Sequence, residues 1–252
     1  MKKKTQKNTS KNIEKEIIIP DSFKYNICLT FDGVLTYNYT TKILNILKKH
    51  NIKATFFIIG KTIEKNYELV KRIIDEGHEI GNHTWDHYDL TKLTEEEIYI
   101  TIKNNNKILK NLFNYTPTYF RPPFGALDKR TYEIIRKLFP DLKIIHWNCD
   151  SGDAISPRLS IEESISRIEE KMKLLQNDMV LLLHINSDLF KNSEETLSML
   201  ILNKIIAASL KKNIQFIKTS ELSFKNSSLY RFHKIKWYNL LEQNKTREWY
   251  LY

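Results

Sequence analysis

The sequence predicts an α/β fold in which about seven parallel strands form a deformed (β/α) barrel. Strand-like runs alternate with helical patterns along most of the 252 residues, and this order implies parallel strands joined by right-handed crossovers. Polar residues able to do chemistry follow almost every strand at its C-terminal end, which is the face where barrel active sites form. An open doubly wound sheet is the main alternative, although no glycine-rich phosphate-binding motif follows any of the strands.

The expected strands are short β-rich runs, and longer stretches of helical periodicity separate them. Strands are expected at 26–31, 54–59, 79–82, 118–121, 144–148, 179–184 and 215–218. Helices are expected near 41–50, 63–76, 94–113, 129–138, 161–175 and 193–212. Two of these helices begin with a capping-box signal, because Thr94 precedes Glu97 by three residues and Ser160 precedes Glu163 by three.

The barrel is expected to occupy residues 21–222, with a different composition at each end of the chain. Residues 1–20 lack periodicity and carry many Lys and Asn, which is typical of a disordered or extended basic tail. Residues 223–252 mix Lys and Arg with Tyr and Trp. We expect this extension to pack on the barrel with Trp237, Leu240 and Leu241 inward, and stacking on sugars or nucleic acid is the alternative.

The composition is that of a globular chain, with 41% hydrophobic and 28% charged residues. The 40 Lys and Arg exceed the 30 Asp and Glu, which gives a formal charge of +10. Such a balance can indicate nucleic acid or anionic surfaces as partners, but the Lys are scattered over many segments, so no nucleic-acid partner is expected. Cys28 and Cys149 lie in apolar runs without zinc-finger spacing, which favours small buried strand residues.

No apolar stretch of about 18 residues occurs in the sequence, so no membrane span is expected. The basic N-terminus is not followed by an apolar segment of signal-peptide length. We therefore expect a cytoplasmic or intracellular location, with secretion by another route left open. The sequence predicts no oligomeric state.

A pair of histidines, His83 and His87, follows the expected strand 79–82. Spaced four residues apart on one face of a helical turn, the two imidazoles can reach one metal ion, and coincidence is the alternative. The remaining histidines show no such pairing. His50 and His78 are expected at helix ends, His146 in the core, and His233 in the basic C-terminal extension.

Three further polar residues end or follow expected strands. Asp32 follows the first strand and suits a general base near a bound metal and its water. Arg121 precedes two prolines, whose rigid turn favours orientation of a carboxylate, with a solvated Arg as the alternative. His184 ends a buried apolar strand, where it can protonate a leaving group or be held through a partner carboxylate, and a purely structural hydrogen-bonded His is the alternative.

These residues form an ordered set of motifs. The motifs are His83-Thr84-Trp85-Asp86-His87, Arg121-Pro122-Pro123 and Leu182-Leu183-His184, together with the runs KATFFIIG and GHEIGNHTWDH. With this set the chain resembles the polysaccharide deacetylases, which include chitin deacetylases and peptidoglycan N-acetylglucosamine deacetylases. The resemblance extends from about residue 25 to residue 222.

The resemblance implies a deformed barrel and a hydrolase that acts on the acetamide of N-acetylglucosamine polymers, with a divalent metal, most often zinc. Carried over by position, it assigns the following roles: Asp32 as base, His83 and His87 as metal ligands, Arg121 as the residue orienting the base, His184 as acid, and Asp153 as the carboxylate orienting His184, with Asp150 as the alternative. It also implies a sugar-binding role for Phe124, Trp147 and Leu182, although the aromatic rings suit the core equally.

The chain departs from the family pattern at the first motif, where Thr-Phe-Asp-Asp-Gly-Pro is replaced by TFDGVL at 30–35. In an ungapped alignment Gly33 takes the place of the metal-binding Asp. With a one-residue deletion, Asp32 is left for both tasks. Asp86 compensates only if its side chain turns toward the metal. Two neutral imidazoles bind a cation more weakly than two imidazoles and a carboxylate.

Two further departures lie close to the expected acid, because Ala154 replaces a usual Trp and Ile185 replaces a usual Asp. Two hypotheses follow from the resemblance and its gaps. The chain is either a metal-dependent deacetylase of acetylated polysaccharide, weakened by the lost ligand, or a catalytically inactive relative that binds carbohydrate or has a structural role.

Overall fold

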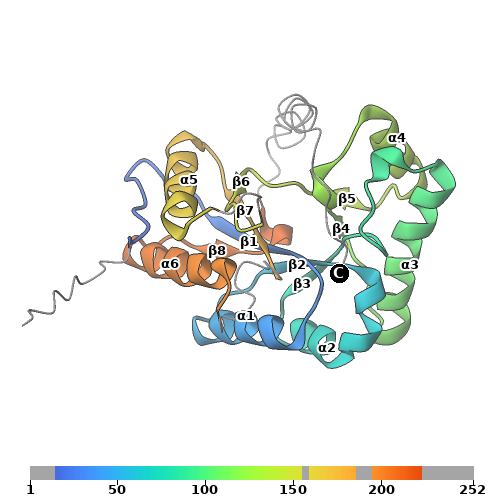
Figure 1. Cartoon of the computed structure of the whole chain (residues 1–252), viewed down its shortest axis with the longest axis horizontal. Helices are drawn as coiled ribbons and strands as arrows, with labels where there is room; N and C mark the ends of the chain where they lie inside the picture. The colour runs from blue at the N-terminus through green and yellow to red at the C-terminus, as the bar shows by residue number, and fades with distance from the viewer. Residues whose placement is uncertain (1–14, 155–158, 186–194, 223–252) are drawn as a thin grey trace, which may run out of the picture.

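The centre of the computed structural model is a sheet in which all strand pairs are parallel (Figure 1). The structure describes residues 15–154, 159–185 and 195–222. Its strands are β1 (Ile27–Gly33), β2 (Thr55–Ile58), β3 (Glu79–Asn82), β4 (Tyr119–Phe120), β5 (Lys143–Ile144), β6 (Cys149–Asp150), β7 (Met179–His184) and β8 (Phe216–Ile217). Seven of them run in the order β5-β4-β3-β2-β1-β7-β6, and β8 pairs with the start of β1. The predicted deformed barrel of about seven parallel strands is therefore confirmed.

The predicted strand 144–148 is wrong for most of its length, because only Ile144 lies in a strand, at the end of β5, and β6 begins after the range at Cys149. β5 lies beside β4 at one edge of the sheet and β6 lies beside β7 at the other, so residues 145–148 cross between the edges. Hydrogen bonds from the Arg121 side chain hold this crossing, since Nε donates to the carbonyl of Ile145 at 3.0 Å and Nη2 to that of His146 at 3.0 Å. The sheet is thus a curled barrel in which residues 145–148 link the two edges, held by side chains that include Arg121 and Asn148.

Helices surround the sheet, with α1 and α2 below it, α3 and α4 at one end and α5 and α6 at the other in Figure 1. Their bounds are α1 Tyr37–Lys49, α2 Tyr67–Asp75, α3 Glu95–Phe113, α4 Lys129–Leu138, α5 Ile161–Leu174 and α6 Leu197–Lys211. All six lie where the periodicity predicts helices. Both predicted capping boxes are present, at Thr94 with Glu97 and at Ser160 with Glu163.

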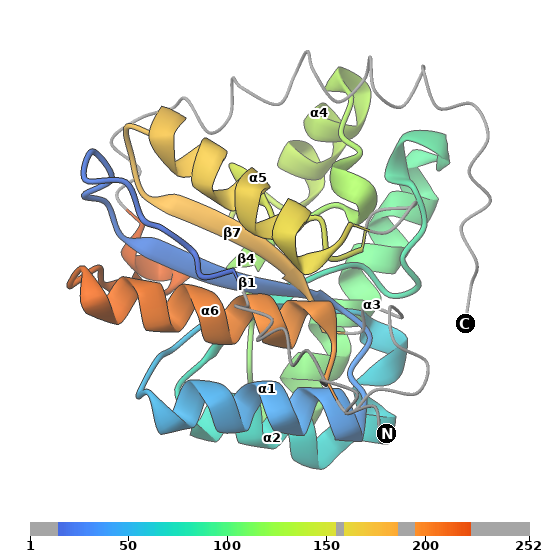
Figure 2. The same ribbon diagram turned by 60° about the vertical axis from the view of Figure 1, so that its left-hand side comes forward.

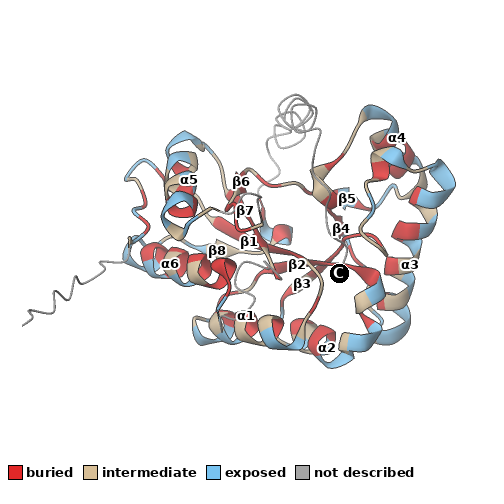
Figure 3. Cartoon of the chain, in the orientation of Figure 1, coloured by how far each residue is buried: buried red, intermediate tan, exposed pale blue. Residues whose placement is uncertain are grey.

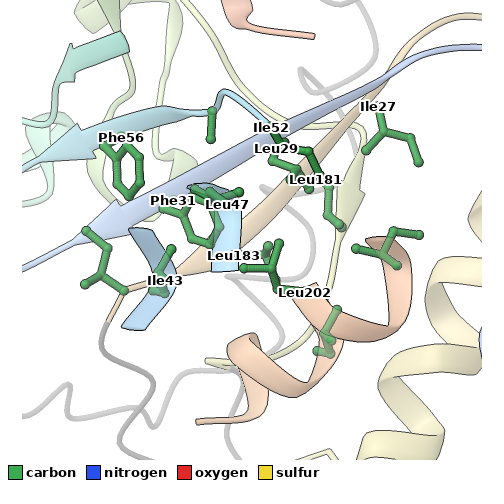
Figure 4. Close-up of a cluster of buried hydrophobic side chains, with 14 of the residues drawn as sticks. Ile27, Leu29, Phe31, Ile43, Leu47, Ile52, Phe56, Leu181, Leu183 and Leu202 are labelled. Carbon is green, nitrogen blue, oxygen red and sulfur yellow. The ribbon is translucent and has the colours of Figure 1, made fainter. Parts of the chain in front are cut away.

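The core is divided between the two faces of the sheet because side chains alternate along each strand. Ile27, Leu29 and Phe31 of β1 face α1 and α6, which run along the same side of that strand (Figure 2), and they pack there with Leu181, Leu183 and Leu202 (Figure 4). The helices are buried toward the sheet and exposed on their outer sides (Figure 3).

The other face of β1 turns Cys28, Thr30 and Asp32 into the barrel, where Cys28 packs with Val180, Leu182, Trp147 and Leu222.

The buried cysteines fit the sequence prediction, since Cys28 lies in β1 and Cys149 in β6. Burial raises the pKa of each thiol to about 12, so neither is a thiolate at neutral pH. No helix in the described part of the chain is both long and apolar enough to cross a membrane.

The end of the predicted basic tail packs against the barrel. Ile17 and Ile19 are only 4% and 3% exposed, and the backbone N–H of Ile18 donates to Glu169 of α5 at 2.7 Å. Ile17 and Ile19 thus add to the core. The rest of the tail and the whole C-terminal extension, with Trp237, Leu240, Leu241 and His233, lie outside the described residues.

Candidate active site

The predicted site residues gather at the C-terminal ends of the strands. Asp32 and His184 are register partners on β1 and β7, so their Cα atoms face each other across neighbouring strands. His83 follows β3, and Arg121 follows β4, which pairs with β3. Sequence-distant loops therefore meet at one end of the barrel, as strand-end placement predicts.

The His83–His87 segment is not a helical turn, which corrects the geometry predicted from its spacing. Thr84 and His87 adopt positive φ values of 64° and 67°, and a non-glycine residue rarely does so. These two positions fold the loop back on itself. The imidazole rings of His83 and His87 still meet, with centroids 4.9 Å apart and an edge-to-face arrangement.

The imidazole of His83 has a defined tautomer. Its Nδ1 lies 2.7 Å from the Arg121 carbonyl oxygen, which only accepts hydrogen bonds, so Nδ1 carries the hydrogen and Nε2 carries the lone pair. Burial lowers the pKa of His83 and of His87 to about 3. Both rings are therefore neutral at neutral pH, which is the state that binds a metal.

Asp32 and Arg121 form a buried ion pair. Arg121 Nη1 donates to Asp32 Oδ1 at 2.7 Å and to Thr30 Oγ1 at 2.9 Å, and the Arg121 side chain is fully buried. The guanidinium carbon lies 4.1 Å from the centre of the Phe57 ring. The second oxygen of Asp32 lies 3.9 Å from His83 Nε2. Arg121 is therefore no solvated turn residue, since it orients Asp32 toward the imidazole pair.

On the opposite side of Asp32, His184 is held by Asp153. Asp153 Oδ1 lies 2.8 Å from His184 Nδ1, and Oδ2 accepts the backbone N–H of His184 at 2.7 Å. Burial alone lowers the pKa of His184, but the charge and hydrogen bond of Asp153 outweigh it and raise the pKa to about 9. Asp150 instead accepts the Gly152 N–H and lies 3.6 Å from Arg167. Of the two candidate carboxylates, the structure places Asp153 on His184.

The backbone at Gly33, where the family resemblance leads us to expect a metal-binding Asp, is structurally open. Gly33 has a φ of 123°, and a Cβ built there meets no atom within 4 Å. Asp86 is not turned toward the imidazoles, because its Oδ1 accepts the Thr101 hydroxyl at 2.8 Å. In the described residues, no three His, Cys, Asp or Glu side chains are grouped as a metal-binding set. The nearby potential donors are the two neutral imidazoles of His83 and His87, whose ring centres lie 4.9 Å apart, and the second oxygen of Asp32, 3.9 Å from His83 Nε2.

The three predicted sugar-binding residues lie in different environments. Phe124, with a φ of 60°, is half-buried, and its ring centre is 4.6 Å from that of His87. Trp147 and Leu182 are 6% and 3% exposed and pack together inside the barrel. Contact of all three residues with sugar stays a prediction. His146, expected in the core, is half-buried in the crossing between β5 and β6 because that segment leaves the sheet.

Sequence reasoning missed Thr101 and Asn105, two buried polar residues of α3 that contact the His83–His87 loop. A signal for them is present, because they interrupt the buried apolar face formed by Ile98, Ile102 and Leu109.

Comparison with known proteins identifies the family. The polysaccharide deacetylase family model matches residues 22–139. Over 127 residues the chain is 42% identical to the peptidoglycan-N-acetylglucosamine deacetylase PgdA of Listeria monocytogenes. The aligned region covers 50% of this chain and 26% of the relative. The chain thus spans about a quarter of the length of that curated relative.

Solved structures extend the match beyond the family model. The Bc1960 peptidoglycan N-acetylglucosamine deacetylase is 30% identical with a TM-score of 0.69, covering 81% of this chain and 91% of that one. BA3943 of Bacillus anthracis, a pseudoenzyme of carbohydrate esterase family 4, is 26% identical with a TM-score of 0.66, covering 79% and 65%. A BA3943 mutant has restored enzymatic activity.

A fold neighbour carries a metal. The family 4 acetyl xylan esterase of Clostridium thermocellum was solved with a cobalt ion, at 24% identity and a TM-score of 0.66, covering 77% of this chain and 88% of that one. Sequence, family model and fold agree, and the chain belongs to the polysaccharide deacetylase family.

Proposed function

We propose that this chain is a metal-dependent deacetylase that hydrolyses the acetamide of N-acetylglucosamine in a polysaccharide, and that loss of one carboxylate ligand weakens it. The observation that carries the proposal is the placement of two residue pairs. The Asp32–Arg121 pair lies beside the imidazoles of His83 and His87, and the His184–Asp153 pair faces it from the neighbouring strand.

The metal site would consist of His83 and His87, whose neutral rings suit a divalent cation, with zinc as the preferred ion. When bound, such a cation polarises the acetamide carbonyl and lowers the pKa of water. Because two imidazoles would hold the cation and Asp32 is needed as the base, affinity should be lower than in a site with a separate carboxylate ligand.

Asp32 and His184 would move the protons. Arg121 occupies Oδ1 of Asp32, which leaves Oδ2 to accept a proton from the attacking water. Asp153 occupies Nδ1 of His184, which leaves Nε2 to donate a proton to the departing amine. The raised pKa of His184, about 9, keeps that proton in place at neutral pH.

The substrate class follows from the relatives, whose names specify peptidoglycan N-acetylglucosamine. We propose peptidoglycan as the polymer, with chitin as a second acetylated substrate to test. The alternative function, an inactive carbohydrate-binding or structural protein, is favoured by Gly33 and by the likeness to a pseudoenzyme.

Zinc titration of the metal-free protein by calorimetry tests the proposal. We expect one site with micromolar affinity in the wild type and none in His83→Ala. Absence of zinc binding in the wild type, together with retained binding of chitin oligosaccharides, would favour the inactive alternative.

A further inference from the structure

The loop that carries both imidazoles is attached to one face of α3. Thr101 and Asn105 lie four residues apart on that helix, are 4% and 0% exposed, and stand among apolar residues that face the sheet. Polar side chains at such positions are stable only when hydrogen-bonded. Each of the two side chains makes at least one hydrogen bond to a residue of the loop.

Asn105 joins the loop to the end of β2. Its Nδ2 donates to the carbonyl of Thr84 at 2.7 Å and to that of Ile58 at 2.8 Å. The Thr84 carbonyl also accepts the backbone N–H of Gly60 at 2.9 Å. Thr84 is one of the two residues with positive φ, so Asn105 fixes the loop where its backbone is least favourable.

Thr101 holds the next two residues of the loop. Its hydroxyl accepts the backbone N–H of Trp85 at 3.0 Å and donates to Asp86 Oδ1 at 2.8 Å. On the other side, Asn82 Oδ1 accepts the N–H of Thr84 at 2.8 Å, while its Nδ2 donates to the carbonyl of Ile102 on α3 at 2.9 Å. The helix therefore contacts the loop directly at Thr84, Trp85 and Asp86 and indirectly through Asn82.

Close approach of α3 depends on Gly60. A Cβ at Gly60 would lie 2.6 Å from the Trp85 ring and 3.2 Å from the Asn105 backbone. The segment that follows β2 thus packs so closely against the loop and against α3 that no residue larger than glycine fits at position 60.

We propose that Thr101 and Asn105 are positioning residues, which hold the two imidazoles at the separation that a shared cation needs. A loop with two positive φ values keeps one conformation only while its surroundings impose it. Loss of either α3 contact should let the loop relax and separate the rings, although neither residue touches an imidazole. This inference rests on the proposed metal site.

Two matched pairs of variants test it. Thr101→Val removes the hydroxyl and nearly keeps the shape, whereas Thr101→Ser keeps the hydroxyl. Asn105→Leu removes both donated hydrogen bonds, whereas Asn104→Leu makes the same change one residue away; in the described part of the chain, no hydrogen bond joins the Asn104 side chain to residues 83–87.

The first readout is Co²⁺ affinity, measured by absorption titration. We expect Thr101→Val and Asn105→Leu to bind Co²⁺ about 10- to 100-fold more weakly than wild type, which is typical when a supporting contact of a metal ligand is lost. Thr101→Ser and Asn104→Leu should remain within about threefold. Affinity within twofold of wild type in both Thr101→Val and Asn105→Leu would overturn the inference.

The second readout is amide hydrogen exchange in the metal-free protein, which separates this inference from the proposed function. Thr101→Val should raise exchange at Trp85 by about tenfold, as expected for one lost hydrogen bond, while amides of β2 and of α3 stay protected. If wild type binds no Co²⁺, the proposed function fails, and unchanged exchange at Trp85 would refute the positioning role as well. If Asn105→Leu does not fold, the Thr101 pair decides.

Discussion

The carboxylate of Asp153 holds His184 at two points, with Oδ1 2.8 Å from the ring Nδ1 and Oδ2 accepting the backbone N–H at 2.7 Å. Asp153 is fully buried, so this carboxylate cannot turn to another partner without breaking both contacts. The pair therefore fixes both the orientation and the charge of the imidazole that faces Asp32.

Asp153→Asn should lower the pKa of His184 clearly from about 9, because burial is then opposed only by the smaller effects of the Asp32 and Asp150 charges. Titration of the His184 ring protons by NMR measures this directly. In an active protein, the alkaline limb of the pH profile should move to lower pH in parallel.

Asp150→Asn is the control for that substitution. The charge of Asp150 also raises the pKa of His184, but it is the weakest of the named causes, so the shift should be clearly smaller than in Asp153→Asn. Equal shifts in the two variants would contradict the assignment of Asp153.

The same pair links stability to alkaline pH. Because the pKa of His184 is raised from 6.5 to about 9 on folding, its stabilisation is complete below pH 6.5 and disappears as pH rises through 9. Denaturant unfolding at pH 6 and pH 9.5 should show this loss in wild type and a smaller loss in Asp153→Asn.

Gly33→Asp should restore a carboxylate where a Cβ has free space, but at a backbone φ of 123° that strains any L residue. We expect zinc affinity to rise by up to about a hundredfold, consistent with one added charge about 4 Å from a cation. Stability should fall by about 1–2 kcal/mol. Calorimetric titration with zinc and denaturant unfolding measure the two effects.

Gly33→Asn is the matched control, since it has the same shape and the same strain without the charge. It should lose the same stability and gain little zinc affinity. If both variants gain affinity equally, a missing charge is not the defect of the site.

Arg121→Gln should destabilise the fold by about 3–5 kcal/mol, because it leaves the buried Asp32 carboxylate without its partner. It also removes the hydrogen bonds from the Arg121 side chain to the carbonyls of Ile145 and His146, in the segment that links the two edges of the sheet. Arg130→Gln, on the exposed side of α4, should cost less than about 1 kcal/mol. Chemical denaturation compares the two, and similar losses would mean that the buried pair does not stabilise the barrel.

Acid should destabilise the protein through its buried histidines. His78 accepts the Ala54 N–H through Nδ1, and burial lowers its pKa to about 4. Since the unfolded pKa is 6.5, this contribution is complete above pH 6.5 and is lost as pH falls through 4. His78→Asn, which keeps an acceptor and cannot titrate, should flatten the fall in denaturation midpoint between pH 6.5 and 4, and an unchanged slope would contradict the assignment.

The sequence predicted regular elements well and irregular ones poorly. The observed bounds of β7 (Met179–His184) and α4 (Lys129–Leu138) match the predicted ranges, because continuous apolar burial and helical periodicity are local signals. The predicted strand 144–148 fails beyond Ile144 because of a distant residue, since the Arg121 side chain donates to the carbonyls of Ile145 and His146, which a strand neighbour would otherwise bind. No pattern inside that segment shows this.

The sequence predicted which residues form the candidate site better than it predicted how they are arranged. Placement at strand ends predicted that Asp32, His83, Arg121 and His184 converge, and the structure brings them together. The four-residue spacing of the histidines suggested a helical turn, whereas contacts with α3 impose a loop with positive φ at Thr84 and His87. Those contacts join residues 16 to 21 positions apart, which spacing alone cannot show.

The proposed deacetylase activity is measured as zinc-dependent release of acetate from N-acetylated peptidoglycan. We expect slow release by wild type with zinc, none after chelation of the metal, and none by His184→Ala under either condition. Release that persists without metal or without His184, or no release by wild type at saturating zinc, would contradict the proposed activity.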